Sequence, residues 1–396
     1  MSRRTLLLLA LTCAVGVGNI YFPQAVSPLA GAGLGVGPDA AAATVTATQI
    51  GYTAGIFLLV PLGDRLPYRP LLVTLLALCS AALLTAGLAP TLPVLVAASV
   101  LVGTTTVAAQ LIGPMAAGLA APGHRGATMG TLLSGSIGGM LLARTFSGTL
   151  GERLGWRAPY LVAAAVVVLL AAVLFRALPA TDLPRTRRSY PALLAEPLRL
   201  LRTEPELRRS GLYQAAVFAG FSAVWTCAAL LLTGPAYGLD AEAVGLLALV
   251  GGPTMVCTPL AGRLTDRRGS DPVTFLALAG VLLAAVVLLS GGRGGTSGLV
   301  ALVLGTLVLD IAMQCGMVAN QARVYALRPD ARSRLNTAYM TCVYLGGSAG
   351  SWLGVHAYGR LGWPGVCALM AGLAAVALAR HLGRVRRAAG HQDGPR

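Results

Sequence analysis

Two ionisable side chains lie well inside long apolar stretches of this sequence: the guanidinium of Arg144 and the carboxyl of Asp310. A charged side chain at the centre of a membrane-spanning helix costs roughly 2.5–3.5 kcal/mol, so each needs an explanation. Their expected depths differ by about 9 Å at 1.5 Å per residue, which a long arginine can bridge. We predict that Asp310 exchanges a proton and that Arg144 is its counter-ion or an anion anchor. A static buried ion pair, or an arginine bonded to backbone carbonyls, is the structural alternative.

Uncharged polar and aromatic residues also occur inside the apolar stretches, several of them at helical spacing. Gln314, Met317 and Gln321 follow Asp310 at four, seven and eleven residues, on one face of a helix. The candidate residues of this kind are Asn19, Tyr21, Gln24, Thr106, Gln110, Tyr213, Gln214, Trp225, Gln314 and Gln321. For any one of them, a hydrogen bond between helices is as reasonable as contact with a ligand.

The composition is that of a polytopic membrane protein. Of the 396 residues, 56% are hydrophobic and 11% charged, and the mean hydropathy is +0.73. A water-soluble protein needs roughly 25% charged residues to cover its surface. All 30 basic residues are arginine. The absence of lysine excludes a Walker A loop, and therefore ATP-driven transport by this chain alone. It also excludes a lysine Schiff base.

Apolar stretches long enough to cross a membrane recur twelve times, and the arginines between them alternate in number. The stretches are 6–27, 44–62, 70–89, 92–120, 127–150, 158–177, 211–233, 244–261, 272–291, 298–322, 336–357 and 363–381. With both termini cytoplasmic, 25 arginines fall on the cytoplasmic side and 4 on the other. The positive-inside rule therefore predicts this orientation in a cell inner membrane. The net charge of +16 is accounted for by this asymmetry, so no nucleic-acid partner is expected.

The chain repeats itself at about half its length. Asp64-Arg65 and Asp266-Arg267 are 202 residues apart, and the two Arg-Leu-Gly-Trp segments at Arg153 and Arg360 are 207 apart. We predict an all-α fold of two six-helix bundles in the same orientation. The expected parts are 1–177, an amphipathic cytoplasmic linker at 178–210, 211–381, and a basic tail at 382–396. Glycines at four-residue spacing, such as Gly346, Gly350 and Gly354, predict close helix contacts, either as ordinary packing or where the two halves slide.

These loops resemble those of the major facilitator superfamily. Gly262 to Gly269 matches that family's G-x-x-x-D-R-x-G signature, whereas the first loop has Val60 and Pro67 in place of glycine. The stretches Asn19–Gln24, Gly126–Trp156 and Asp310–Ser351 are similar to the bacterial arabinose-efflux-permease-like and drug-efflux branch. The antiporter pattern on the fifth helix and the arginine commonly found on the fourth are absent.

The resemblance implies twelve helices, no cofactor, and alternating access to a central cavity lined by the first, fourth, seventh and tenth helices. It places the ten polar and aromatic candidates in that cavity, whose few charges suit a neutral or weakly charged solute. We predict that the loop charges are gate elements, because an aspartate near a helix N-terminus and an arginine bridged to a carboxylate can make contacts in one state and break them in the other. These residues are Asp64, Arg65, Arg69, Asp266, Arg267 and Arg268; topology determinants are the alternative.

The expected function is proton-coupled export of a drug, sugar or metabolite by a monomer in contact with membrane lipids. Proton-coupled import is the alternative on the same fold. A membrane sensor or membrane-embedded enzyme is the alternative of another class, although no metal-ligand or nucleophile motif supports an enzyme.

Overall fold

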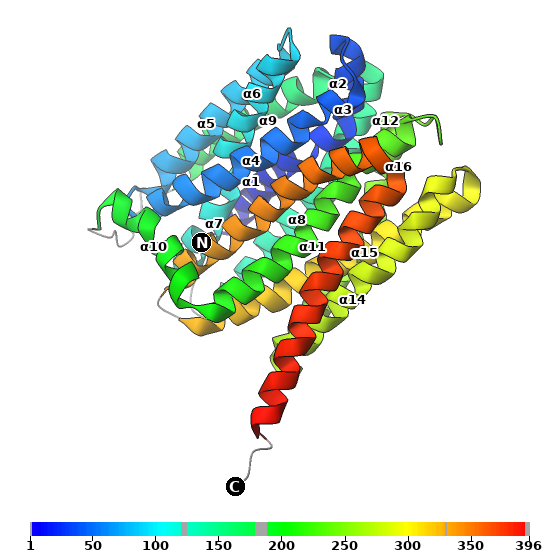
Figure 1. Ribbon diagram of the computed structural model, residues 1–396. Coiled ribbons are helices and arrows are strands. Elements are labelled where there is room, and N and C mark those ends of the chain that lie inside the picture. Colours follow the sequence, from blue (N-terminus) through cyan, green and yellow to red (C-terminus); the bar gives the residue numbers. More distant parts are fainter. Residues whose placement is uncertain (1, 120–124, 179–187, 329–330, 393–396) are drawn as a thin grey trace. The chain divides into compact units, whose positions relative to one another are not determined.

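The computed structural model describes residues 2–119, 125–178, 188–328 and 331–392, and this part of the chain is helical without strands (Figure 1). The α-helices are α1 Arg3–Tyr21, α2 Pro23–Leu34, α3 Pro38–Ala41, α4 Ala43–Leu58, α5 Tyr68–Gly87, α6 Leu92–Thr105, α7 Ala108–Leu119, α8 Arg125–Leu154, α9 Ala158–Ala177, α10 Tyr190–Thr203, α11 Pro205–Thr233, α12 Ala241–Leu249, α13 Thr254–Arg268, α14 Ser270–Leu289, α15 Gly295–Leu327 and α16 Arg332–Gln392. Two 3-10 helices, η1 Val60–Asp64 and η3 Ser290–Arg293, extend α4 and α14.

Ten helical segments among the described residues are long and apolar enough to cross a membrane. Two features separate this number from the predicted twelve. The expected stretches 336–357 and 363–381 are joined in α16, which is broken at Gly362 by a φ of 63°. The expected stretch 127–150 lies in α8, which contains Arg144 and is not among the ten. The exact number of spans stays a prediction.

Several of the predicted membrane spans are each divided into two helices in the structure. The first divides at Phe22, before Pro23, into α1 and α2, and the fourth divides after Thr106 into α6 and α7. Proline lacks the N–H that would continue the ladder, which explains the break before Pro23; no proline lies at the break after Thr106. The hydroxyl of Thr106, at the second break, donates to the Gly16 carbonyl of α1 at 2.9 Å.

The described chain forms two compact units. Unit 1 comprises residues 1–200 and 228–249, and unit 2 comprises 201–227 and 250–396. Residues 228–249 thus belong to unit 1 by their contacts, although the sequence places them after the linker. The boundaries of the two expected halves stay a prediction.

Glycines allow helices within each unit to approach closely. In unit 1, a Cβ on Gly103 of α6 would lie 2.0 Å from the Thr48 carbonyl oxygen of α4. In unit 2, Gly346, Gly350 and Gly354 of α16 face the backbone of α11 in the same way. These contacts are inside a unit, so they correspond to the packing alternative of the sequence analysis.

The linker region contains an amphipathic helix, α10. Leu193, Pro197 and Leu200 are buried, whereas Leu198 and Arg199 are exposed. Part of the predicted linker, 179–187, lies outside the described residues. Contact of α10 with a membrane surface stays a prediction.

Candidate functional site

Arg144 lies at the centre of a polar cluster in unit 1. Its side chain is fully buried, and its Nε donates to Oε1 of Gln24 at 2.6 Å. The guanidinium lies 5.0 Å from the ring centre of Tyr21, a cation–π distance. Ser147, one turn further along α8, donates to the Phe22 carbonyl at 2.9 Å. The break between α1 and α2 therefore places two predicted site residues, Tyr21 and Gln24, beside the Arg144 guanidinium.

The remaining predicted residues of unit 1 bond to each other or to nearby helices. Asn19 Nδ2 donates to Thr106 Oγ1 at 3.4 Å. Gln110 Nε2 donates to the Tyr52 hydroxyl at 3.0 Å. Sequence reasoning missed Tyr52, which is fully buried. Buried hydrogen bonds of this kind orient the helices and hold neutral polar groups inside the unit.

Asp310 is a buried ionisable residue of unit 2, on α15. The side chain is 1% exposed, and Trp225 Nε1 donates to its Oδ1 at 3.1 Å. An indole N–H is a donor only, so it can bond to a carboxylate or to the carbonyl oxygen of a neutral carboxyl. This contact therefore tolerates both protonation states. The predicted pairing of Arg144 with Asp310 joins residues of different units and stays a prediction.

The other predicted residues of unit 2 divide between two places. Gln214 Nε2 donates to the Met313 carbonyl at 3.2 Å, close to Asp310 along α15. Gln321 instead donates to Asn336 Oδ1 at 3.0 Å. Tyr213 packs edge-on against His381 with ring centres 5.7 Å apart. Gln314 is buried beside Asp310 on α15.

The predicted gate residues lie at helix ends. Asp64 ends η1, and the Arg69 guanidinium lies 4.6 Å from the Phe175 ring centre. Arg65 is exposed, as are Asp266, Arg267 and Arg268 at the end of α13. Arg267 and Arg268 are in the last turn of that helix, where cations interact favourably with the helix dipole. A gating role for these loops stays a prediction.

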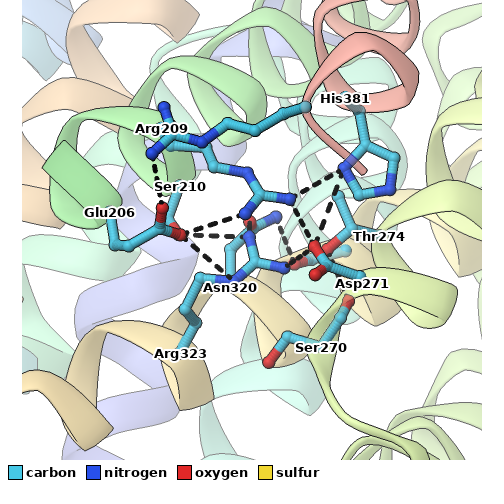
Figure 2. A network of polar contacts seen from close by, with 11 residues as sticks. Glu206, Arg209, Ser210, Ser270, Asp271, Thr274, Asn320, Arg323 and His381 are labelled. Atoms are coloured by element: carbon cyan, nitrogen blue, oxygen red, sulfur yellow. Dashed lines mark hydrogen bonds and ion pairs between the residues drawn. The ribbon is translucent and has the colours of Figure 1, made fainter. Parts of the chain in front are cut away.

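Unit 2 contains a charged network that the sequence analysis did not predict; its arginines entered only the count that predicts the membrane orientation. Figure 2 shows Asp271, at the start of α14, between Arg209 of α11 and Arg323 of α15. Arg209 donates to Asp271 Oδ1, and Arg323 Nη2 lies 2.6 Å from the same oxygen. Both arginine side chains are nearly buried, at 10% and 11% exposure, so these contacts are less screened than a surface pair.

Glu206 and His381 complete the network (Figure 2). Glu206 Oε2 lies 3.0 Å from Arg209 Nη1, and its Oε1 lies 3.0 Å from Arg384 Nη2. His381 Nδ1 lies 3.2 Å from Arg209 Nη2. An arginine only donates, so His381 Nδ1 accepts here, which assigns the neutral imidazole with its proton on Nε2. The network joins α11, α14, α15 and α16 at one end of unit 2.

A second contact that sequence reasoning missed packs α8 against α12 within unit 1. Thr145 Oγ1 donates to the Gly245 carbonyl at 2.8 Å, and the Ala241 N–H donates to Glu152 Oε2 at 3.2 Å. A Cβ on Gly148 would lie 2.3 Å from the Ala241 carbonyl oxygen. The carboxylate of Glu152 thus satisfies an N–H in the first turn of α12. Glu152 and Ala241 are 89 residues apart in the sequence, so local sequence patterns did not predict this contact.

Comparison with known proteins gives the family. The model described as Major Facilitator Superfamily matches residues 7–304 and, in an overlapping second match, 230–396. The putative uncharacterized transporter YgaY of Escherichia coli (strain K12) is 34% identical over 378 residues, covering 96% of this chain and 95% of that protein. The probable transporter SCO4007 of Streptomyces coelicolor is 34% identical, covering 93% and 84%. The chloramphenicol resistance protein of Streptomyces lividans is 31% identical, covering 70% and 69%.

Solved structures agree on the fold. The nucleoside transporter NupG superposes with a TM-score of 0.74 at 14% identity, covering 96% of this chain and 99% of that one. The peptide transporter POT in complex with sulfate gives 0.74 at 18% identity, covering 97% and 94%. Likeness at this identity concerns the fold alone. The whole-chain family match, the transporter relatives and the shared all-helical fold lead to one conclusion: this chain belongs to the major facilitator superfamily of membrane transporters, and it is a transporter rather than an enzyme.

Proposed function

We propose that the protein exports a small, uncharged or weakly charged organic solute in exchange for protons, with Asp310 as the proton-exchanging group. The observation that carries this proposal is the burial of the Asp310 carboxyl, which accepts a hydrogen bond from Trp225 that suits either protonation state. When a carboxyl at such a position gains or loses its charge, the free energy of burying it changes by several kcal/mol. That change can bias a transporter between two conformations.

The solute class follows from the polar side chains within each unit. Amide, hydroxyl and aromatic groups predominate, as in sites for neutral, partly apolar ligands. A relative is named for chloramphenicol resistance, so chloramphenicol is the first solute to test. We also propose cytoplasmic termini in the cell inner membrane, on the distribution of arginines in the sequence, and a monomer as the transporting unit.

The test is flux of chloramphenicol into proteoliposomes with an imposed pH gradient. An exchanger accumulates the solute when the lumen is acidic, because protons leaving the lumen drive its entry. Accumulation only when the outside is acidic would mean proton-coupled import and would contradict export.

The Asp310→Asn variant tests the role of the carboxyl. Asparagine keeps an oxygen for the Trp225 N–H but cannot exchange a proton, so we expect gradient-driven accumulation to fall by about tenfold or more, equivalent to about 1.4 kcal/mol in the barrier. Asp39→Asn, at an exposed acid in the first turn of α3, is the matched control and should transport normally. Undiminished gradient-driven flux in Asp310→Asn would eliminate the carboxyl from coupling.

A further inference from the structure

Three buried side chains of unit 1 have hydrogen-bonding groups without partners in the described part of the chain. Gln49, 1% exposed, pairs neither Nε2 nor Oε1, and Ser27, 2% exposed, does not pair its hydroxyl. Gln24 is fully buried and accepts from Arg144 through Oε1, but its Nε2 is unpaired. Buried polar side chains are nearly always hydrogen-bonded, so these three uncharged side chains call for a ligand or a physical reason.

The surrounding residues show that the helices themselves can satisfy such groups. On the same helix as Gln49, Thr48 and Thr53 each donate to a carbonyl four residues earlier, at 2.8 Å. Ser147, as buried as Ser27, donates to the Phe22 carbonyl of the neighbouring segment. The unpaired atoms of Gln49 and Ser27 therefore do not reflect a general lack of partners in unit 1.

The backbone places Gln24 and Gln49 at similar heights, with Ser27 about one helical turn from Gln24. Gln24 and Ser27 are three residues apart on α2, which brings their side chains to one face. Helix α2 packs on α3 and α4, and a Cβ on Gly31 would lie 3.1 Å from the Cβ of Ala41. Counting from that contact gives about 10.5 Å back along α2 to Gln24 and about 12 Å forward through α3 and α4 to Gln49.

We propose that Ser27, Gln49 and Nε2 of Gln24 form a subsite for the uncharged, hydroxyl- or amide-bearing part of the transported solute. This inference rests on the proposed function and adds Ser27 and Gln49 to the solute-binding residues. The unpaired atoms include donors on both amides and acceptors on Gln49 and Ser27. A carboxylate would satisfy only the donors and an ammonium only the acceptors, whereas an amide or a pair of hydroxyls satisfies both.

Thermal stability without solute gives the first test. Ser27→Ala and Gln49→Met remove unpaired polar atoms, so we expect the unfolding midpoint to stay or to rise by roughly 2 °C. Ser147→Ala and Gln214→Met are the matched controls, because the same exchanges remove hydrogen bonds at equally buried positions, and they should lower the midpoint. If the Ser27 and Gln49 variants lose as much stability as the controls, their groups are already satisfied, for example by ordered water, and the subsite is refuted.

Binding of chloramphenicol gives the second test. We expect Ser27→Ala and Gln49→Met each to raise the KM for chloramphenicol flux by about three- to tenfold, as for loss of one hydrogen bond to a neutral partner, with dependence on the pH gradient retained. Asp310→Asn should show the reverse, with coupling lost and thermal stabilisation by chloramphenicol kept. The two proposals can therefore fail separately. Unchanged KM in both subsite variants, or no stabilisation of the unsubstituted protein by chloramphenicol, would overturn the subsite.

Discussion

The contact between α11 and α16 at Gly350 allows a quantitative prediction. A Cβ on Gly350 would lie 2.1 Å from the Ala219 carbonyl oxygen and 2.4 Å from its Cα, so Gly350→Ala requires the helices to separate. The opposing atoms belong to the backbone, and no side-chain rotation can relieve the overlap. Overpacking costs about 1–3 kcal/mol, and the better helix propensity of alanine offsets about 1 kcal/mol. We expect a net loss of about 2 kcal/mol, since an overlap with backbone lies at the upper end of that range.

Gly372→Ala is the matched control on the same helix. A Cβ on Gly372 meets nothing within 4 Å, so only the propensity gain applies, up to about 1 kcal/mol. The two alanine variants should therefore differ by about 3 kcal/mol in stability despite an identical chemical change. Thermal unfolding of the purified proteins in one detergent measures the difference. Equal unfolding midpoints for the two variants would refute the close approach of α11 to α16.

Two further predictions concern the charged network of unit 2. A proton on Nδ1 of His381 would remove the acceptor for Arg209 and place another cation beside it, so the unfolding midpoint should fall on acidification below neutral pH. His381→Gln should make the unfolding midpoint less dependent on pH. The control His356→Gln, at an exposed histidine, should follow the unsubstituted protein. Identical pH profiles of the unfolding midpoint for His381→Gln and the unsubstituted protein would contradict this. Asp271→Asn removes the carboxylate between Arg209 and Arg323, and we expect a loss of about 1 kcal/mol, because Asp271 is 47% exposed and its ion pairs are partly screened. Chemical unfolding measures this loss. A variant as stable as the unsubstituted protein would show that the ion pairs of Asp271 do not contribute to the free energy of unfolding.

Some features of the site were predictable because they depend on local sequence. Arg144 and Asp310 stand out against apolar neighbours, and both are buried in the structure. The polar residues at helical spacing near them were also identifiable. Their bonding partners were not. Gln321 bonds to Asn336, and Tyr213 packs on His381, because the rotation of each helix decides which neighbour a side chain meets.

The sequence by itself determined the membrane class, the internal repeat and the family, because hydropathy, arginine distribution and loop motifs are properties of short segments. Only the tertiary structure decided that Gln24 bonds to Arg144, that Asp271 lies between two arginines, and that Gln49 is buried without a partner among the described residues. These contacts join residues far apart in the chain. They depend on how helices are rotated and shifted against one another, and helical periodicity alone leaves both undetermined.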